Sequence, residues 1–125
     1  MRRYWIWILP FSVAATIVWL SSQPSYPFEI SLPGPLDKVA HLLAFGVLAA
    51  CTDIAWRRTH PALPLVRRLL LIFIGVALFG ASDEFHQYFV PGRSCDFFDW
   101  LADAIGGGLG LILVAGPGLW KRKAG

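Results

Sequence analysis

Residues 69–116 read LLLIFIGVALFGASDEFHQYFVPGRSCDFFDWLADAIGGGLGLILVAG, and this stretch decides the fold. Two apolar runs, at about 69–90 and 97–119, flank the short turn VPGRSC. Each run is close to the roughly 20 residues that a helix needs to cross a hydrocarbon core about 30 Å thick. Because a Pro-Gly pair favours a tight turn, the stretch predicts two transmembrane helices joined as a hairpin.

Two further apolar runs precede the hairpin, at about 4–21 and 37–56. We interpret all four runs as helices, because an open sheet edge in lipid leaves backbone groups without partners. Pro10 lies inside the first run, where a kink is tolerated. The segment 22–36 contains four prolines, which exclude a regular helix there. The sequence therefore predicts an all-α membrane protein with four transmembrane helices in a single domain, residues 1–125.

The composition excludes a soluble domain. Hydrophobic residues make up 56% of the chain and charged residues 15%, whereas soluble domains carry roughly 25% charged residues. The net charge of +3 does not indicate a nucleic-acid partner, because the basic residues lie between apolar runs and form no single patch. The first run follows two arginines, as in a signal peptide, but it is long and lacks a clear cleavage site. We expect it to be retained as a helix.

The basic residues also predict the orientation. Nine of the eleven Lys and Arg residues lie at the two ends of the chain or in the segment 57–68. The positive-inside rule places these regions in the cytoplasm, an N-in/C-in topology with VPGRSC facing outward. Cys51 lies 14 residues beyond Asp37, about 21 Å deeper at 1.5 Å per residue. Cys51 is therefore too far from Cys95 in the outer turn to form a disulfide.

Polar residues gather at the predicted outer ends of three helices. They are Asp37, Lys38 and His41 in the second run, Asp83, Glu84 and Gln87 in the third, and Arg93, Asp96, Asp99 and Asp103 in and before the fourth. In the fourth run the acidic residues are three or four positions apart, and the same stripe continues into Gly106 and Gly110. Small residues at this spacing let helices approach closely. We expect the three polar stripes to converge on a cavity open to the non-cytoplasmic side.

Ionisable residues within membrane helices are candidates for a functional site. Inserting a charged side chain at the bilayer centre costs about 2.5–3.5 kcal/mol. Clustered carboxyl groups in a dry cavity suit acid–base chemistry, so Glu84, Asp99 and His41 are candidate catalytic residues. The candidate ligand-binding residues are Asp37, Lys38, Asp83, Gln87, Arg93, Asp96 and Asp103.

Simpler roles stay open for several of these residues. Asp37 and Asp96 are also placed to cap helices, and Lys38 to extend to the membrane interface. Arg93 suits either an ion pair or an anion ligand. We expect no metal cofactor, because no tight metal motif is present.

A divalent ion nevertheless stays an alternative. His41, Asp83, Glu84 and Asp99 offer the imidazole and carboxylate ligands that such an ion takes.

The segments DKVAHLLAFGVL and SDEFHQYFVPGRSCDFFDWLADAIGGGLG resemble the VanZ-like family of small bacterial membrane proteins. The resemblance covers about residues 35–112. The matching positions are Asp37, Lys38, His41, Asp83, Glu84, Gln87, Arg93, Asp96 and Asp99. Two positions depart from the family pattern, since Asp103 stands where Asn is more frequent and Phe45 where Tyr is common.

The resemblance implies a multi-pass protein of the bacterial cytoplasmic membrane with a role in the cell envelope. The family name derives from an accessory protein of glycopeptide resistance, so a contribution to teicoplanin resistance is expected. The chain would then bind an envelope lipid or a lipoglycopeptide in its outward cavity.

Two alternatives remain. One is an enzyme acting on a lipid-linked headgroup, and the other is a proton- or ion-coupled transporter. The inner halves of the helices show few polar residues, which argues against transport. No oligomeric state is predicted.

Overall fold

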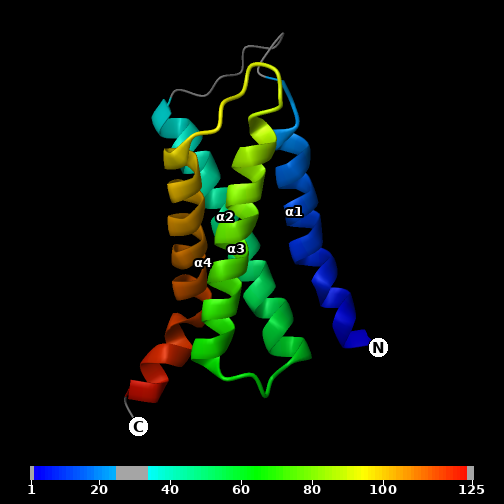
Figure 1. The fold of residues 1–125 in the computed structure, drawn as a ribbon. Coiled ribbons are helices and arrows are strands. Elements are labelled where there is room, and N and C mark those ends of the chain that lie inside the picture. The colour runs from blue at the N-terminus through cyan, green and yellow to red at the C-terminus, as the bar shows by residue number, and fades with distance from the viewer. Residues whose placement is uncertain (1, 25–33, 124–125) are drawn as a thin grey trace.

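The computed structural model describes residues 2–24 and 34–123, and these residues form a bundle of helices (Figure 1). The elements are a 3₁₀-helix η1 (Arg2–Trp7), which continues into α1 (Ile8–Ser21), followed by α2 (Gly34–Thr59), α3 (Leu65–Gln87) and α4 (Phe97–Lys123). Within the described residues, four helical segments are long and apolar enough to cross a membrane. The prediction of an all-α protein with four such helices is confirmed.

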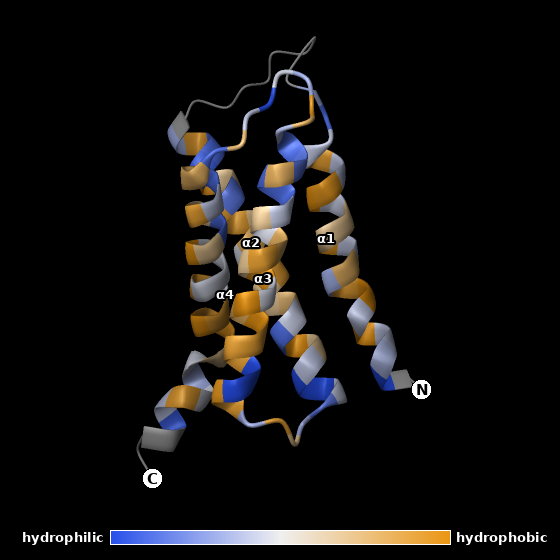
Figure 2. Ribbon diagram, in the orientation of Figure 1, coloured by the Kyte–Doolittle hydropathy of each residue, from blue (hydrophilic) through white to orange (hydrophobic). Residues whose placement is uncertain are grey.

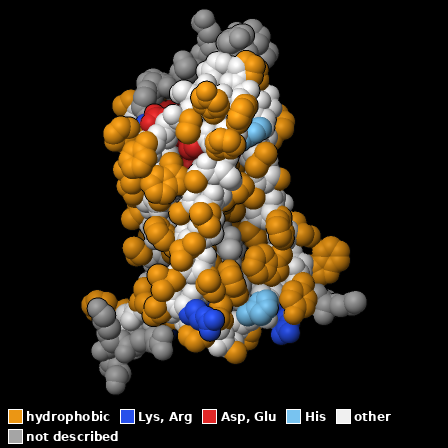
Figure 3. Space-filling view, in the orientation of Figure 1, with side chains coloured by type: hydrophobic (Ala, Val, Ile, Leu, Met, Phe, Trp, Pro, Cys, Tyr) orange, Lys and Arg blue, Asp and Glu red, His pale blue; other side chains and the backbone are white. Residues whose placement is uncertain are grey.

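The described connections between the helices lie at the two opposite ends of the bundle (Figure 1). The two ends of the chain lie near the α2–α3 connection, and the α3–α4 turn lies at the opposite end (Figure 1). Hydrophilic residues gather at both ends, and hydrophobic residues cover the middle (Figure 2). On the visible face, basic side chains lie mainly at the end with the termini, and acidic side chains show near the other end (Figure 3).

Three helices extend beyond the apolar runs that predicted them. α2 begins at Gly34 and ends at Thr59, and α3 begins at Leu65. Arg57 and Arg58 therefore lie in the last turn of α2, and the first turns of α3 also carry arginines. A helix can continue past its apolar run, because long basic side chains near its end can extend to water. Hydropathy alone therefore placed these boundaries too close to the middle of each helix.

The prolines inside helices have different consequences. Pro10 is the third residue of α1, and α1 directly follows the 3₁₀-helix η1. Proline is tolerated in a first turn, because the N–H that it lacks has no helical partner there. Pro117 lies inside α4, and the C-terminal part of this helix bends away from the bundle (Figure 1). An interior proline removes a backbone hydrogen bond and favours such a bend.

α2 and α4 approach each other through glycines. A Cβ atom added at Gly106 would lie 2.2 Å from the carbonyl oxygen of Leu42, and one at Gly110 would lie 2.2 Å from that of Gly46. Neither position has room for a side chain. The expectation that the Gly106–Gly110 stripe permits close helix packing is confirmed, and this packing sets the distance between the polar residues of α2 and α4.

A compact apolar layer fills the middle of the bundle. Its fully or nearly buried members are Ile17, Phe45, Leu48, Ala49, Ile72, Val76 and Leu111. Many other large apolar side chains are exposed on the outside, including Leu113 at 80% and Trp5 at 70%. An outer surface of this kind is what a lipid environment requires.

Candidate functional site

Three helices and one turn bring the polar side chains to the end of the bundle that carries the α3–α4 turn. Asp37, Lys38 and His41 come from the first turns of α2, and Asp83, Glu84 and Gln87 from the last turns of α3. Asp99 and Asp103 come from the start of α4, and Arg93 and Asp96 from the turn before it. Asp83, Glu84, Gln87, Asp99 and Asp103 are buried.

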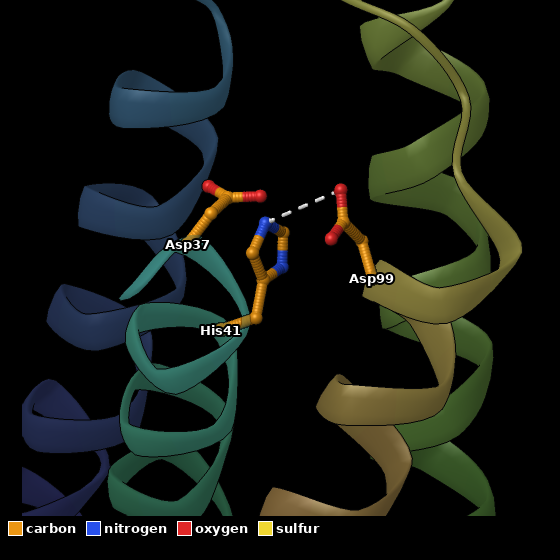
Figure 4. Close-up of side chains that lie close together, drawn as sticks. All are labelled: Asp37, His41 and Asp99. Atoms are coloured by element: carbon orange, nitrogen blue, oxygen red, sulfur yellow. Dashed lines mark ion pairs between the residues drawn. The ribbon is translucent and has the colours of Figure 1, made fainter. Parts of the chain in front are cut away.

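His41 lies at the centre of these groups. Its Nδ1 atom is 2.8 Å from Oδ1 of Asp103 and 4.0 Å from Oε1 of Glu84. Its Nε2 atom is 3.9 Å from Oδ2 of Asp99. Figure 4 shows Asp37 and His41 on α2 facing Asp99 on α4. One imidazole therefore faces carboxyl groups from α2, α3 and α4.

Lys38 joins α2 to the start of α4. Its ammonium group forms ion pairs with Asp99 and with Asp96, the latter at 2.9 Å. Asp96 Oδ1 also accepts a hydrogen bond of 2.8 Å from the backbone N–H of Phe98, so Asp96 caps α4. The donated bonds from Lys38 and from Phe98 hold the pKa of the Asp96 carboxyl below its usual range. Lys38 is therefore an ion-pair partner within the cluster.

Asp37 does not cap its helix, so this part of the prediction is wrong. α2 begins at Gly34, and Asp37 is the fourth helical residue. The Pro-Gly-Pro sequence before it suggested a later start, but proline is compatible with a first helical turn. The carboxyl group of Asp37 lies instead beside His41 and Asp99, and their ligand atoms lie within 4.8 Å of one another.

Asp83 belongs to a second hydrogen-bonded group that joins α3 to α1. Its Oδ2 atom accepts a bond of 2.8 Å from the Ser21 hydroxyl and one of 3.3 Å from the Gln87 amide. Sequence reasoning missed Ser21, although its position at the outer end of the first apolar run was the available signal. Asp83 and Gln87 therefore have partners within the protein.

Arg93 binds the C-terminal end of α1 and no carboxylate among the described residues. Its Nε atom donates to the carbonyl of Gln23 at 3.0 Å, and its Nη2 atom to that of Leu20 at 3.3 Å. Free carbonyls and the negative end of the helix dipole favour a cation at this place. The interpretation of Arg93 as an ion-pair partner is therefore not what the geometry shows.

A cavity of about 210 Å³ lies beside this cluster. Its polar lining consists of Ser21, Asp37, His41, Asp83, Gln87 and Arg93. Phe45 and Ile17 contribute to its apolar lining, and both also belong to the apolar layer in the middle of the bundle.

The cluster contains more acidic groups than the basic groups beside them can balance. Among the described residues here, the acidic groups are Asp37, Asp83, Glu84, Asp96, Asp99 and Asp103. Lys38 and His41 are the groups that face them.

Two buried oxygens of this cluster, Glu84 Oε1 and Asp103 Oδ2, have no hydrogen-bond partner within the described part of the chain. Two sets of side chains are close enough to hold one metal ion, namely Asp37, His41 and Asp99, or His41, Glu84 and Asp103.

A second buried ionic group lies near the other end of α2, and the sequence analysis did not single it out. Asp53 is fully buried, with Arg68 Nε at 2.7 Å from Oδ1 and Arg57 Nε at 3.0 Å from Oδ2. The contact with Arg57 is ionic, since its geometry does not align for a hydrogen bond. The signal was an isolated Asp four residues before an arginine, on a helix whose neighbour also begins with arginines.

Apolar helices with a carboxylate cluster around one partly buried histidine define a multi-pass membrane protein with a polar site inside its bundle. The chain belongs to the VanZ/LLP1 family, whose family model matches residues 2–120. The suspected family is thus confirmed, and the match extends beyond residues 35–112 to include the first helix. No curated protein and no solved structure gives a significant match to the chain.

Proposed function

We propose that this VanZ-like protein binds an envelope lipid or a lipoglycopeptide such as teicoplanin on the non-cytoplasmic side of the bacterial cytoplasmic membrane. The observation that carries the proposal is the set of polar groups around His41, which lies beside a cavity of about 210 Å³ that Asp37 and His41 help to line. Ionisable groups at this depth are costly unless they serve a partner or a ligand. The family membership supports a role in the cell envelope.

The orientation rests on the distribution of basic residues. Arginines and lysines flank the end of the bundle that carries the termini and the α2–α3 connection. The positive-inside rule assigns that end to the cytoplasm. The cluster around His41 then opens toward the outer surface, where envelope lipids and glycopeptide antibiotics are encountered.

The charges of the cavity favour a ligand with amine or hydroxyl groups. Asp37 and Asp83 line it from two helices, and carboxylates accept hydrogen bonds from such groups. Arg93 also lines the cavity, but its guanidinium is already bound to backbone carbonyls of the α1 end. The apolar outer surface of the bundle would hold the lipid part of the same ligand beside it.

A second candidate function is an enzyme acting on a lipid-linked headgroup. The observation in its favour is that Glu84 Oε1 lies beside His41 without a hydrogen-bond partner among the described residues. Glu84 or Asp99 would be the general acid or base and His41 its partner. Ion-coupled transport is less favoured, because the apolar layer containing Phe45 and Ile72 lies between His41 and Asp53.

The test is the teicoplanin and vancomycin susceptibility of a sensitive bacterium that produces the protein. Wild type, Glu84→Gln and Asp99→Asn are compared at matched membrane levels, with Gly116→Ala as a control outside the cluster. We expect wild type and Gly116→Ala to protect against teicoplanin and the two cluster variants to lose protection. Equal susceptibility of all strains would contradict the antibiotic part of the proposal, and unchanged protection in both variants would contradict the role of the cluster.

A further inference from the structure

We propose that His41, Glu84 and Asp103 form a binding site for a divalent transition-metal ion such as Mn²⁺ or Zn²⁺. The inference rests on the proposed function in one respect, since it assigns a cation to the same site. It can nevertheless be tested without any antibiotic or lipid ligand.

The distances between the three side chains suit one ion. At metal–ligand distances of about 2.1 Å, adjacent donor atoms of an octahedral ion lie about 3.0 Å apart and opposite ones about 4.2 Å apart. Nδ1 of His41 lies 2.8 Å from Oδ1 of Asp103 and 4.0 Å from Oε1 of Glu84. The ligand atoms of all three side chains lie within 4.8 Å of one another, so side-chain shifts would bring these donors around a common centre.

The unpaired oxygens are the independent observation that points to a cation. The side chains of Glu84 and Asp103 are 3% and 0% exposed. Each has a carboxylate oxygen without a hydrogen-bond partner among the described residues. A buried carboxylate oxygen in this state is costly, and a dication would satisfy the charge of both groups at once.

Asp83, Asp96 and Asp99 already have partners, which separates these three carboxylates from the proposed ligand set. Asp83 accepts hydrogen bonds from Ser21 and Gln87. Asp96 and Asp99 share Lys38. The alternative set of Asp37, His41 and Asp99 is disfavoured, because a metal there would compete with the ammonium group of Lys38.

The types of donor atom and the second ring nitrogen of His41 also suit a transition-metal ion. One imidazole with two carboxylates suits first-row transition metals better than Mg²⁺ or Ca²⁺, which prefer oxygen ligands alone. Binding through Nδ1 requires that this nitrogen carry no proton, so the single proton of the neutral imidazole would be on Nε2. That N–H would face Asp99, 3.9 Å away, and a carboxylate behind a histidine ligand commonly orients the ring.

The experiment measures Mn²⁺ binding to the full-length protein in detergent micelles after removal of metals by a chelator. Electron paramagnetic resonance gives the stoichiometry and affinity, and the pulsed form of the method detects coupling to a ligating imidazole nitrogen. His41→Ala and Glu84→Gln each remove one proposed ligand. Asp83→Asn is the matched control, because it removes a carboxylate beside Glu84 that lies outside the ligand set.

We expect one Mn²⁺ per chain with nitrogen coupling. His41→Ala should abolish the coupling and weaken binding by at least about 10- to 100-fold, as for losses at other metal sites. Glu84→Gln should weaken binding at least about tenfold more than Asp83→Asn does. Absence of stoichiometric binding, absence of nitrogen coupling, or equal losses in Glu84→Gln and Asp83→Asn would overturn the metal site.

The two proposals fail in distinguishable ways. Teicoplanin protection by the protein without stoichiometric Mn²⁺ binding would overturn the metal site and leave the proposed function standing. Stoichiometric Mn²⁺ binding with nitrogen coupling, in a protein that gives no protection, would support the metal site and contradict the antibiotic role.

Discussion

Helix α2 carries two ionic groups that differ in how their charges are balanced. Near one end, Asp53 is fully buried between Arg68 and Arg57, so two cations face one carboxylate. Near the other end, His41 and Lys38 face several carboxylates from three helices. His41 and Asp53 are twelve residues apart, about 18 Å at 1.5 Å per residue, and the apolar layer lies between them.

The difference indicates different roles for similar residues. A buried carboxylate with close cationic partners on both oxygens holds helices together, and its partners can hardly be removed without cost. A buried group with unpaired oxygens and excess negative charge contributes little to stability in the absence of a ligand. We therefore interpret the Asp53 group as structural and the His41 group as the functional site.

The largest expected effect is a loss of stability at the Asp53 group. Arg68→Ala removes the closest partner of the buried Asp53 carboxylate, and breaking a buried pair in this way costs about 3–5 kcal/mol. Thermal unfolding in detergent micelles measures the loss. Arg58→Ala is the control, because Arg58 is exposed, and equal stability of the two variants would break the comparison.

A smaller effect is expected where glycine sets the distance between α2 and α4 beside His41. Gly106→Ala places a Cβ atom 2.2 Å from the Leu42 carbonyl oxygen, and overpacking of this kind costs about 1–3 kcal/mol. Gly116→Ala, with nothing within 4 Å of its added Cβ, should be neutral or stabilising. The melting temperatures of both variants check this, and similar values would contradict the close approach of the helices.

In the cluster around His41, a substitution should not lower the stability of the protein as it does at the Asp53 group. Glu84→Gln removes one excess buried charge, and its side-chain carbonyl can still accept the Asp96 N–H bond, now 3.1 Å long. We expect the melting temperature to stay the same or to rise, with a gain of up to roughly 2 kcal/mol, while teicoplanin protection is lost. A destabilisation as large as that of Arg68→Ala would mean that Glu84 is a structural residue.

The smallest effect concerns pH. Because the pKa of Asp96 is lowered in the folded protein, its stabilising contribution is present above the unfolded value of about 4 and is lost as the pH falls through the folded value. The melting temperature of Asp96→Asn should therefore lie slightly below wild type at neutral pH and converge with it in acid. Ser94→Ala is the control, because it removes no charge and its effect on the melting temperature should not depend on pH. If the difference between Asp96→Asn and wild type were also independent of pH, this would contradict the ionised pair of Asp96 with Lys38.

Much of the fold could be predicted because hydropathy and glycine spacing act locally. Apolar runs of bilayer length locate helices wherever they pack, and the Gly106–Gly110 stripe predicts close packing without naming the partner. Helix ends were less predictable, because Arg57 and Arg58 read as a loop but continue α2. Hydropathy reports where lipid ends, whereas backbone hydrogen bonds decide where a helix ends.

The site was predictable only in part, since partners on other helices depend on rotation about each helix axis. Spacing brought Asp99 and Asp103 onto one face of α4, but the pairing of Asp103 with His41 needed the crossing of α2 and α4. Ser21 and Asp53 went unnoticed because a single polar residue in an apolar run has no periodic pattern. Their importance follows from Asp83 and Arg68, which lie on α3.

The most direct test of the central claim is the side of the membrane on which the His41 end lies. Cys95 is an exposed free thiol in the α3–α4 turn at that end. A Cys51→Ala variant leaves it as the single cysteine of the chain. Intact protoplasts or spheroplasts making this variant are treated with a membrane-impermeant maleimide. The account predicts that Cys95 is labelled without lysis, and labelling only after permeabilisation would place the polar end in the cytoplasm and contradict the account.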